Sequence, residues 1–302
     1  MILEGDNRVI DALKEKKRLM EAKQEHGHIR PLLMVGAGLM KGVYGAGAMV
    51  ALEELGYRQV FSSAVGLSSG APTLAYFLAG QAAVLPGLIA EDVASTKLIR
   101  PLHLRNVVNL EYFVDILRGA TGRGLNFPAL LRTPTDFKVA VSAYKTARPV
   151  FFTPGSENVF MDCMRATVAI PGIVTQKVKI DGARYVDGAS TQPYALDAAY
   201  QTIDATHVLA IMNQDRDASH SPRMEKFISA TLVRHRFSPA LLEASTLRHA
   251  ARNQFAQQAI AGPIPTTVVW GDARVGSYER EATYLYEVTE ASRVWWRELL
   301  ST

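Results

Sequence analysis

The stretch "AVGLSSGAPTLAYFLAG", residues 64–80, places two adjacent serines inside a G-x-S-x-G frame. A short apolar run precedes the frame, as in a buried strand, and an uncharged run typical of a buried helix follows it. At such a junction the frame is typical of a nucleophile elbow, a sharp turn that lifts a serine hydroxyl above the sheet. Ser68 is then the central residue between Gly66 and Gly70, and Ser69 opens the helix. The alternative is a small-residue turn that only lets the strand and the helix pack closely.

A second glycine-rich stretch, "GAGLMKG" at residues 36–42, lies upstream, also between an apolar run and a helix-like run. Backbone N–H groups in such a loop can bind a developing negative charge. A dinucleotide-binding loop would instead require an acidic residue at the end of the next strand, where this chain has the serine frame. A phosphate-binding P-loop fails as well, because Gly42 rather than Ser or Thr follows Lys41. An oxyanion loop is the favoured interpretation.

A serine nucleophile needs a base, and the sequence offers two kinds. Asp187 in "YVDGAS" follows a predicted strand and precedes Gly188, so its side chain can reach a serine on a neighbouring strand. Asp181, also followed by glycine, is interpreted as a hairpin turn. The other candidates are the histidines that follow Ser68 and could complete a Ser-Asp-His triad, none of them in a glycine-flanked loop: His207, His220, His235 and His249.

The remaining pattern predicts an α/β core followed by helices. Predicted strands cover residues 31–36, 59–68, 137–144, 149–153 and 205–213, with a hairpin over 178–190 and helices over 43–56 and 69–80. After residue 214 the chain is predicted to be helical, over 224–237, 241–260 and 279–300.

Composition limits the function classes. Hydrophobic residues make up 48% of the 302 residues, which is enough for a substantial core. The net charge of +4 is mild, and no basic run interleaved with aromatics suggests nucleic acid. Cys163 is the single cysteine, and the seven histidines are scattered, so the sequence predicts neither a disulfide framework nor a metal site.

The N-terminal 30 residues are charged throughout and lack the apolar core of a signal peptide. Their apolar spacing predicts an amphipathic helix. Residues 59–90 carry no charge, but glycine and proline interrupt them, which favours a buried strand, turn and helix over a membrane span. We therefore expect a cytoplasmic protein without a signal peptide or transmembrane helix.

Taken together, these motifs resemble the patatin-like phospholipase family. Members carry a G-G-G-x-[RK]-G oxyanion loop, a G-x-S-x-G elbow and an Asp-Gly-[GA] motif, which match "GAGLMKG", "GLSSG" and "DGA" here, in that order. The segment "RATVAIPGIVTQKVKIDGARYVDGAS" at residues 165–190 and "YALDAAYQTIDATHVLAIM" at 194–212 also resemble the family. The resemblance covers about residues 31–214, with a weaker likeness of the C-terminal helices to bacterial members.

The resemblance implies a three-layer α/β/α sandwich with a mostly parallel central sheet. It also implies a catalytic domain over residues 31–214. Together with the apolar spacing, this gives an N-terminal amphipathic helix over 1–30 and a helical C-terminal region over 215–302 that is expected to pack on the core. The resemblance also implies a lipid or lysophospholipid acyl ester as substrate, without a metal or cofactor, and it allows transient contact with a membrane surface.

The same resemblance assigns roles to individual residues. Ser68 becomes the nucleophile and Asp187 its general base. The oxyanion N–H groups would come from the loop around Ala37, Gly38 and Leu39. The supporting motif residues are Gly36, Lys41, Gly42, Gly66, Gly70 and Gly188, of which Lys41 takes the place of the family's basic residue.

This chain departs from the family where relatives have a run of glycines, because it carries Ala37 and Leu39. Leu39 would be strained if its position requires a positive φ. Three functions therefore stay open: a serine lipid acyl hydrolase, a weakly active or inactive relative acting in binding, and a hydrolase with a histidine triad.

Overall fold

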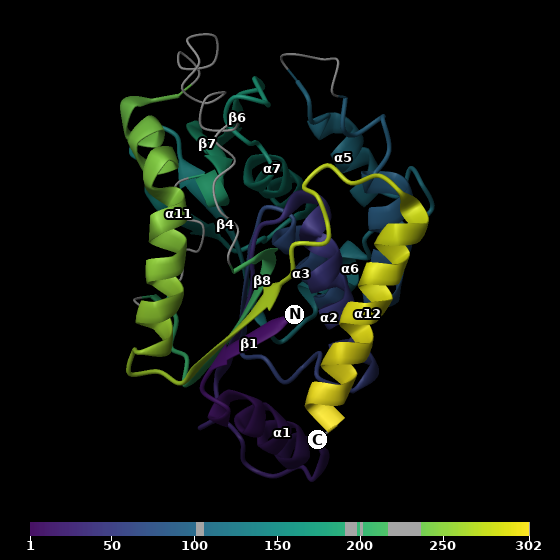
Figure 1. Ribbon diagram of the computed structural model, residues 1–302, viewed down its shortest axis with the longest axis vertical. Helices are drawn as coiled ribbons and strands as arrows, with labels where there is room; N and C mark the ends of the chain where they lie inside the picture. Colours follow the sequence, from purple (N-terminus) through teal and green to yellow (C-terminus); the bar gives the residue numbers. More distant parts are fainter. Residues whose placement is uncertain (101–105, 191–197, 200–201, 217–236, 302) are drawn as a thin grey trace.

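A computed structural model of the chain describes residues 1–100, 106–190, 198–199, 202–216 and 237–301 (Figure 1). Its strands are β1 (Ile2–Gly5), β2 (Pro31–Val35), β3 (Ser63–Leu67), β4 (Asp136–Ala143), β5 (Pro149–Phe152), β6 (Val178–Ile180), β7 (Ala183–Asp187), β8 (His207–Asp215) and β9 (Thr266–Gly271). Its helices are α1 (Arg8–Glu21), α2 (Val43–Glu54), α3 (Gly70–Leu78), α4 (Leu85–Gly87), α5 (Leu110–Leu117), α6 (Phe127–Leu131), α7 (Glu157–Thr167), α11 (Pro239–Ile260) and α12 (Ala282–Ser301). Shorter turns are η1 (Leu39–Gly42), η2 (Ala82–Val84), the π-helix η3 (Leu88–Val93) and η4 (Gly188–Ser190).

All nine strands form one sheet, in which hydrogen-bonded neighbours follow the order β1-β9-β8-β2-β3-β4-β7-β6. Strand β5 also pairs with β4, on the edge opposite to β3 and β7. The five central strands, from β9 to β4, run parallel, and the outer pairings are antiparallel. The carboxyl ends of parallel strands meet at one edge of a sheet, where binding sites of α/β proteins gather. Residue 36 after β2 and residue 68 after β3 both leave the sheet at this edge.

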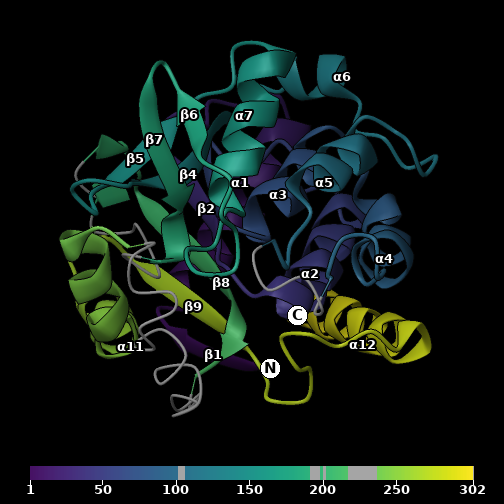
Figure 2. The ribbon, with the colours of Figure 1, turned by 90° about the horizontal axis from the view of Figure 1, so that it is seen from above.

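Alternating strand residues bury themselves on opposite faces of the sheet. Leu33 and Val35 belong to the core shared with α2, α3 and α12, whereas Leu32 and Met34 pack with Ala256 of α11. The helices α11 and α12 accordingly lie on opposite sides of the sheet (Figure 2). This arrangement confirms the predicted three-layer α/β/α fold with a mostly parallel sheet.

The predicted helices after residue 214 are only part of what the structure shows there. The expected helices over 241–260 and 279–300 are present as α11 and α12. The prediction of a purely helical C-terminal region was wrong, because "TTVVWG" forms β9, a fully buried strand between them. β-Branched and aromatic residues fit such a strand, and β1 pairs with it. The helix predicted over 224–237 lies, apart from its last residue, outside the described residues.

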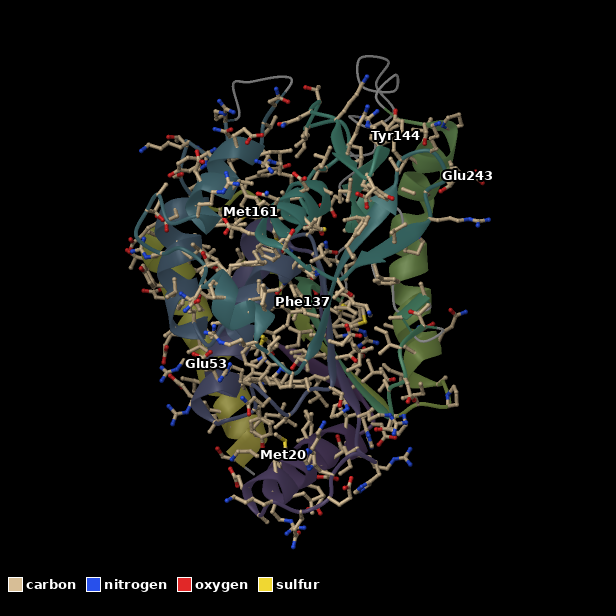
Figure 3. All side chains as sticks on the ribbon, turned by 180° about the vertical axis from the view of Figure 1, so that it is seen from behind. Met20, Glu53, Phe137, Tyr144, Met161 and Glu243 are labelled. Carbon is tan, nitrogen blue, oxygen red and sulfur yellow. The ribbon has the colours of Figure 1, made fainter. Side chains whose placement is uncertain are left out.

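The hairpin prediction is confirmed. Strands β6 and β7 pair antiparallel around Asp181 and Gly182, which have φ of 48° and 78°. Positive φ at both turn residues is the type I′ geometry that suits a two-residue hairpin loop. The hairpin lies beside α7. Met161 of α7 and Phe137 of β4 are buried in the body of the molecule, whereas Glu243 of α11 is exposed at the margin of the molecule (Figure 3).

Within the described part of the chain, no helix combines the length and apolar character that crossing a lipid bilayer requires.

Candidate active site

The G-x-S-x-G frame forms a tight strand-to-helix turn between β3 and α3. Ser68 has a φ of +51°, in the left-handed region that non-glycine residues seldom occupy. A Cβ at Gly66 would lie 2.5 Å from Cα of Ala71, and one at Gly70 would collide with the carbonyl oxygen of Val35. The two glycines are therefore required by close backbone approach. The turn holds Ser68 at the carboxyl edge of the sheet, as the elbow interpretation expects.

The register of β4 explains why Asp187 reaches this serine. Val141 pairs with both β5 and β7, and Ala140 pairs with both β3 and β5, so β3 and β7 share one edge of β4. Strand β3 ends with Leu67 opposite Ala140, and β7 ends with Asp187 opposite Val141. Ser68 therefore leaves β3 where the last residue of β7 arrives.

The side chains of Ser68 and Asp187 meet in a buried hydrogen bond. Oγ of Ser68 donates to Oδ2 of Asp187 over 2.8 Å, and the two residues are 3% and 2% exposed. The N–H of Ala189 donates to Oδ1 of Asp187 over 2.8 Å, which fixes the orientation of the carboxyl group. A serine hydroxyl and a carboxylate at this separation can exchange a proton.

Thr167 is a third buried side chain at the elbow, and the sequence alone did not predict it. Oγ1 of Thr167 accepts the N–H of Ser68 over 2.8 Å and donates to the carbonyl oxygen of Ala140 over 2.8 Å. Thr167 is fully buried at the end of α7 and thus ties the elbow to β4. It stands inside the 165–190 segment that resembles the family, but a hydroxyl in an apolar run gives no sign of its partner.

The predicted oxyanion loop leaves β2 at Gly36, whose N–H still donates to Ile211 of β8 over 2.9 Å. Ala37 and Gly38 are buried, and Lys41 is half-buried on the turn η1. Leu39 has a φ of +51°, the strained conformation anticipated for a side chain at a glycine position. Such a conformation costs about 1–2 kcal/mol for a residue with a Cβ.

Asn213 of β8 is a second functional candidate that the sequence reasoning treated only as the end of a core strand. Its Nδ2 donates to the carbonyl oxygen of Gly36 over 2.7 Å, and its Oδ1 accepts the N–H of Gly45 over 2.8 Å. The residue is fully buried. A polar residue that closes an apolar parallel strand lies at the edge where sites form, and this signal could have identified it.

An apolar cavity of about 90 Å³ adjoins Ser68. Leu39 and Gly42 line it beside the serine, whereas Ala37 and Gly38 are buried on the same loop without lining it. Further lining residues come from α4, η3 and α5: Leu85, Leu88, Ile89, Phe113, Ile116 and Leu117. The cavity thus places an almost purely hydrocarbon surface against the hydroxyl of Ser68.

Cys163 and His207 carry side chains that can act in catalysis elsewhere, but neither belongs to the site around Ser68. Burial raises the pKa of the Cys163 thiol to about 12, which keeps this cysteine protonated and unreactive. His207 opens β8 opposite Pro31, so it lies at the amino edge of the sheet, roughly 15 Å of strand from the serine. His207 therefore cannot serve Ser68. His220 and His235 lie outside the described residues, as does the side chain of His249.

Among the residues that the structure describes, no three His, Cys, Asp or Glu side chains gather in a way that could hold a metal ion.

Known proteins resemble this chain to different extents. The uncharacterized protein YjjU of Escherichia coli (strain K12) is 24% identical over 163 residues, which are 53% of this chain and 45% of YjjU. The chain thus matches less than half the length of that curated relative. The crystal structure of VipD from Legionella pneumophila covers 90% of this chain and 67% of VipD, with 10% identity and a TM-score of 0.43.

The family comparison covers the elbow, the oxyanion loop and the Asp187 hairpin together. The protein-family model "Patatin-like phospholipase" matches residues 33–200. Since that match spans more than half of the 302 residues, the chain belongs to the patatin-like phospholipase family.

Proposed function

We propose that this protein is a serine lipid acyl hydrolase that cleaves carboxylic esters with Ser68 as nucleophile and Asp187 as general base. The observation that carries the proposal is the 2.8 Å hydrogen bond between these side chains, beside an apolar cavity. Membership of the family supports the reaction class. The dyad assignment and the substrate are the proposal's own.

The reaction would proceed by acyl transfer. Oδ2 of Asp187 takes the proton of Ser68 while Oγ attacks the ester carbonyl carbon, and backbone N–H groups of residues 37–39 stabilise the tetrahedral oxyanion. The C–O bond to the alcohol then breaks, and the proton on Asp187 passes to the departing oxygen. A water molecule then attacks the acyl carbonyl carbon while Asp187 accepts a proton from that water. The carboxylic acid departs when the proton passes from Asp187 to Oγ of Ser68.

The apolar walls of the cavity support a proposal for the substrate class. Its lining is almost entirely apolar, and it begins at Ser68, where the acyl carbonyl must sit. An alkyl chain extending from that carbonyl would bury itself against η3 and α5, gaining about 0.8 kcal/mol per methylene removed from water. We therefore propose acyl esters with an apolar chain, such as phospholipids and lysophospholipids, as substrates.

Leu39 supports one alternative, a weakly active or inactive relative that acts in lipid binding. It carries a side chain where the family pattern has glycine and has a positive φ, on the loop proposed to stabilise the oxyanion. A binding protein of this kind would take lipid into the cavity but leave Ser68 unreactive.

The experiment is a panel of lipid and p-nitrophenyl esters combined with fluorophosphonate labelling, since only an activated serine reacts covalently. Ser68→Ala should abolish hydrolysis and labelling, whereas Ser69→Ala, the adjacent control, should retain both in large part. Labelling that survives in Ser68→Ala and disappears in Ser69→Ala would refute the frame assignment. A wild-type protein that binds lipid but neither labels nor hydrolyses any ester would establish the binding alternative.

The proposed route requires no metal ion, because the serine and the carboxylate supply both nucleophile and base. Hydrolysis should therefore persist in excess EDTA with a monomeric ester substrate, which removes effects of calcium on lipid presentation. A calcium requirement under these conditions would contradict the proposed mechanism.

A further inference from the structure

We infer that Asn213 is a positioning residue of the proposed reaction: its side-chain amide holds the oxyanion loop in shape from a strand far away in the sequence. The inference rests on the proposed function, because a loop needs this shape only if it binds an oxyanion. Asn213 does not itself contact the reacting atoms in this scheme.

The amide of Asn213 contacts the chain on both sides of the loop. Nδ2 donates to the carbonyl oxygen of Gly36, one residue before Ala37, over 2.7 Å. Oδ1 accepts the N–H of Gly45, in the first turn of α2, over 2.8 Å. One side chain therefore fixes the point where the loop leaves β2 and the helix turn where it ends.

The position of this contact explains why the loop departs from the sheet. The N–H of Gly36 donates to Ile211, which continues the parallel pairing of β2 with β8. In a regular parallel ladder the Gly36 carbonyl would next accept the main-chain N–H of residue 213. Here the side-chain amide of Asn213 supplies the donor instead. The carbonyl is satisfied while the backbone turns away toward Ser68.

Glycines surround Asn213 because there is no room for other side chains. A Cβ at Gly38 would lie 2.6 Å from Cβ of Asn213, and one at Gly45 would lie 2.8 Å from its Oδ1. A Cβ at Gly271 of β9 would lie 2.8 Å from its carbonyl oxygen. The loop, the helix and the neighbouring strand are all packed onto this one residue.

This packing also accounts for the persistence of the positive φ at Leu39. A strained backbone conformation persists only where contacts with the surrounding structure hold it in place. Asn213 anchors the chain at Gly36 and Gly45, on either side of Leu39. Without these anchors, residues 37–39 can relax to a negative φ at Leu39, which turns their N–H groups away from the oxyanion position.

The test compares two variants of Asn213 that remove different anchors. Asn213→Asp keeps an acceptor for Gly45 but sets an oxygen against the Gly36 carbonyl. Asn213→Leu removes both hydrogen bonds while keeping the same number and branching of non-hydrogen atoms in the side chain. Thr267→Val is the matched control: this threonine of β9 is equally buried and donates to the carbonyl oxygen of Asp6 over 2.7 Å, on the sheet but outside the site. Each protein is first shown to be folded by circular dichroism and thermal unfolding.

We expect both Asn213 variants to lower kcat and the rate of fluorophosphonate labelling by about 10- to 100-fold. This loss is smaller than the loss typical of deleting an oxyanion hydrogen-bond donor itself. KM should change less than about threefold, because the apolar cavity that holds the acyl chain is left intact. Thr267→Val should retain wild-type kinetics even if it unfolds at a lower temperature.

Three results would overturn the inference. The first is wild-type kcat in folded Asn213 variants while Ser68→Ala is inactive, which leaves the proposed function standing. The second is an equal loss of kcat in Thr267→Val, which would show a general effect of destabilisation. The third is a wild-type protein that neither labels nor hydrolyses esters, which overturns the proposed function as well.

Discussion

Two parts of the site hold residues in the same unusual backbone conformation for different reasons. Ser68 in the strand-to-helix turn and Leu39 in the proposed oxyanion loop both have a φ of +51°. The elbow follows the family motif, since close-packed glycines flank the serine. The loop departs from the motif, and the side chain of Asn213 anchors it from β8. Neighbouring glycines can thus support a positive φ, and so can contacts with a distant side chain. Only the neighbouring glycines are recognisable in the sequence as a motif.

The largest effect we predict distinguishes the proposed general base, Asp187, from an aspartate in an ordinary turn. Asp187→Asn should lower kcat by about two to four orders of magnitude, because asparagine keeps the shape of the side chain but cannot accept the proton of Ser68. Asp181→Asn, also followed by glycine, should leave kcat near wild type, because Asp181 is a hairpin turn residue. Steady-state hydrolysis of a soluble ester measures both. Near-wild-type turnover in folded Asp187→Asn would show that the dyad is wrong and that another base must be sought.

The next effect tests how the elbow itself is held. Thr167→Val is nearly isosteric but loses the hydrogen bonds to Ser68 and Ala140, so kcat should fall by about 10- to 100-fold through misplacement of the nucleophile. Thr167→Ser keeps the hydroxyl and should recover most of the loss. Thr135→Val is the control, since Thr135 is a buried threonine that donates to the carbonyl oxygen of Phe61 away from the site. If Thr167→Val and Thr135→Val have the same kcat, Thr167 only stabilises the fold.

These comparisons show what the sequence could and could not predict. The α/β core, the hairpin and the candidacy of Ser68 follow from local signals, namely apolar runs, an Asp-Gly turn and the G-x-S-x-G frame. The three-layer arrangement and the choice of Asp187 over the histidines came from the resemblance to the family. Strand β9 was not predicted, because its six residues form a short β-branched run between two long helices. Pairing in a sheet is non-local, so a short strand leaves a weak local signal in the sequence.

The supporting residues of the site were missed for a related physical reason. Thr167 and Asn213 act through contacts with residues that are 99 and 177 positions away in the sequence. No periodicity or spacing encodes such a contact, because it arises only when the sheet brings the strands together. Leu39 was the opposite case: the sequence showed that a side chain stands where the family has glycine, and the structure supplies the positive φ and the anchor.

A smaller effect tests the strain at Leu39. Leu39→Gly and Leu39→Ala both remove the side chain from the cavity wall, so each should raise KM for an apolar ester a few-fold. Only glycine also accepts a positive φ freely, so Leu39→Gly should be more stable to urea than Leu39→Ala by about 1 kcal/mol. kcat should stay within about threefold of wild type in Leu39→Gly. Equal stability of the two variants would mean that residue 39 does not hold a left-handed conformation in solution.

The smallest effect on activity is expected at the other end of β3. Lys16 of α1 is buried, and its Nζ donates to Oγ of Ser62, just before the strand that ends at the elbow. Burial lowers the pKa of Lys16 from 10.5 to about 8, and the like charge of Arg30 adds to the shift. Between pH 8 and 10.5 the unfolded chain therefore keeps a proton that the folded protein has released.

The free energy of unfolding should consequently rise with pH across that window, because stability rises wherever the unfolded state binds more protons. Below pH 8 both states bind the proton, and the folded protein carries the full cost of the buried charge. Lys16→Met should then be more stable than wild type at pH 7, with the difference shrinking from pH 8 to 10 in urea denaturation. Other titrating groups are common to both proteins and cancel in that difference. kcat and KM at pH 7 should not change, because the contact lies a full strand away from Ser68. A stability difference independent of pH would show that Lys16 titrates normally, and a changed kcat would show that the elbow responds to the whole of β3 rather than to Thr167 and its own glycines.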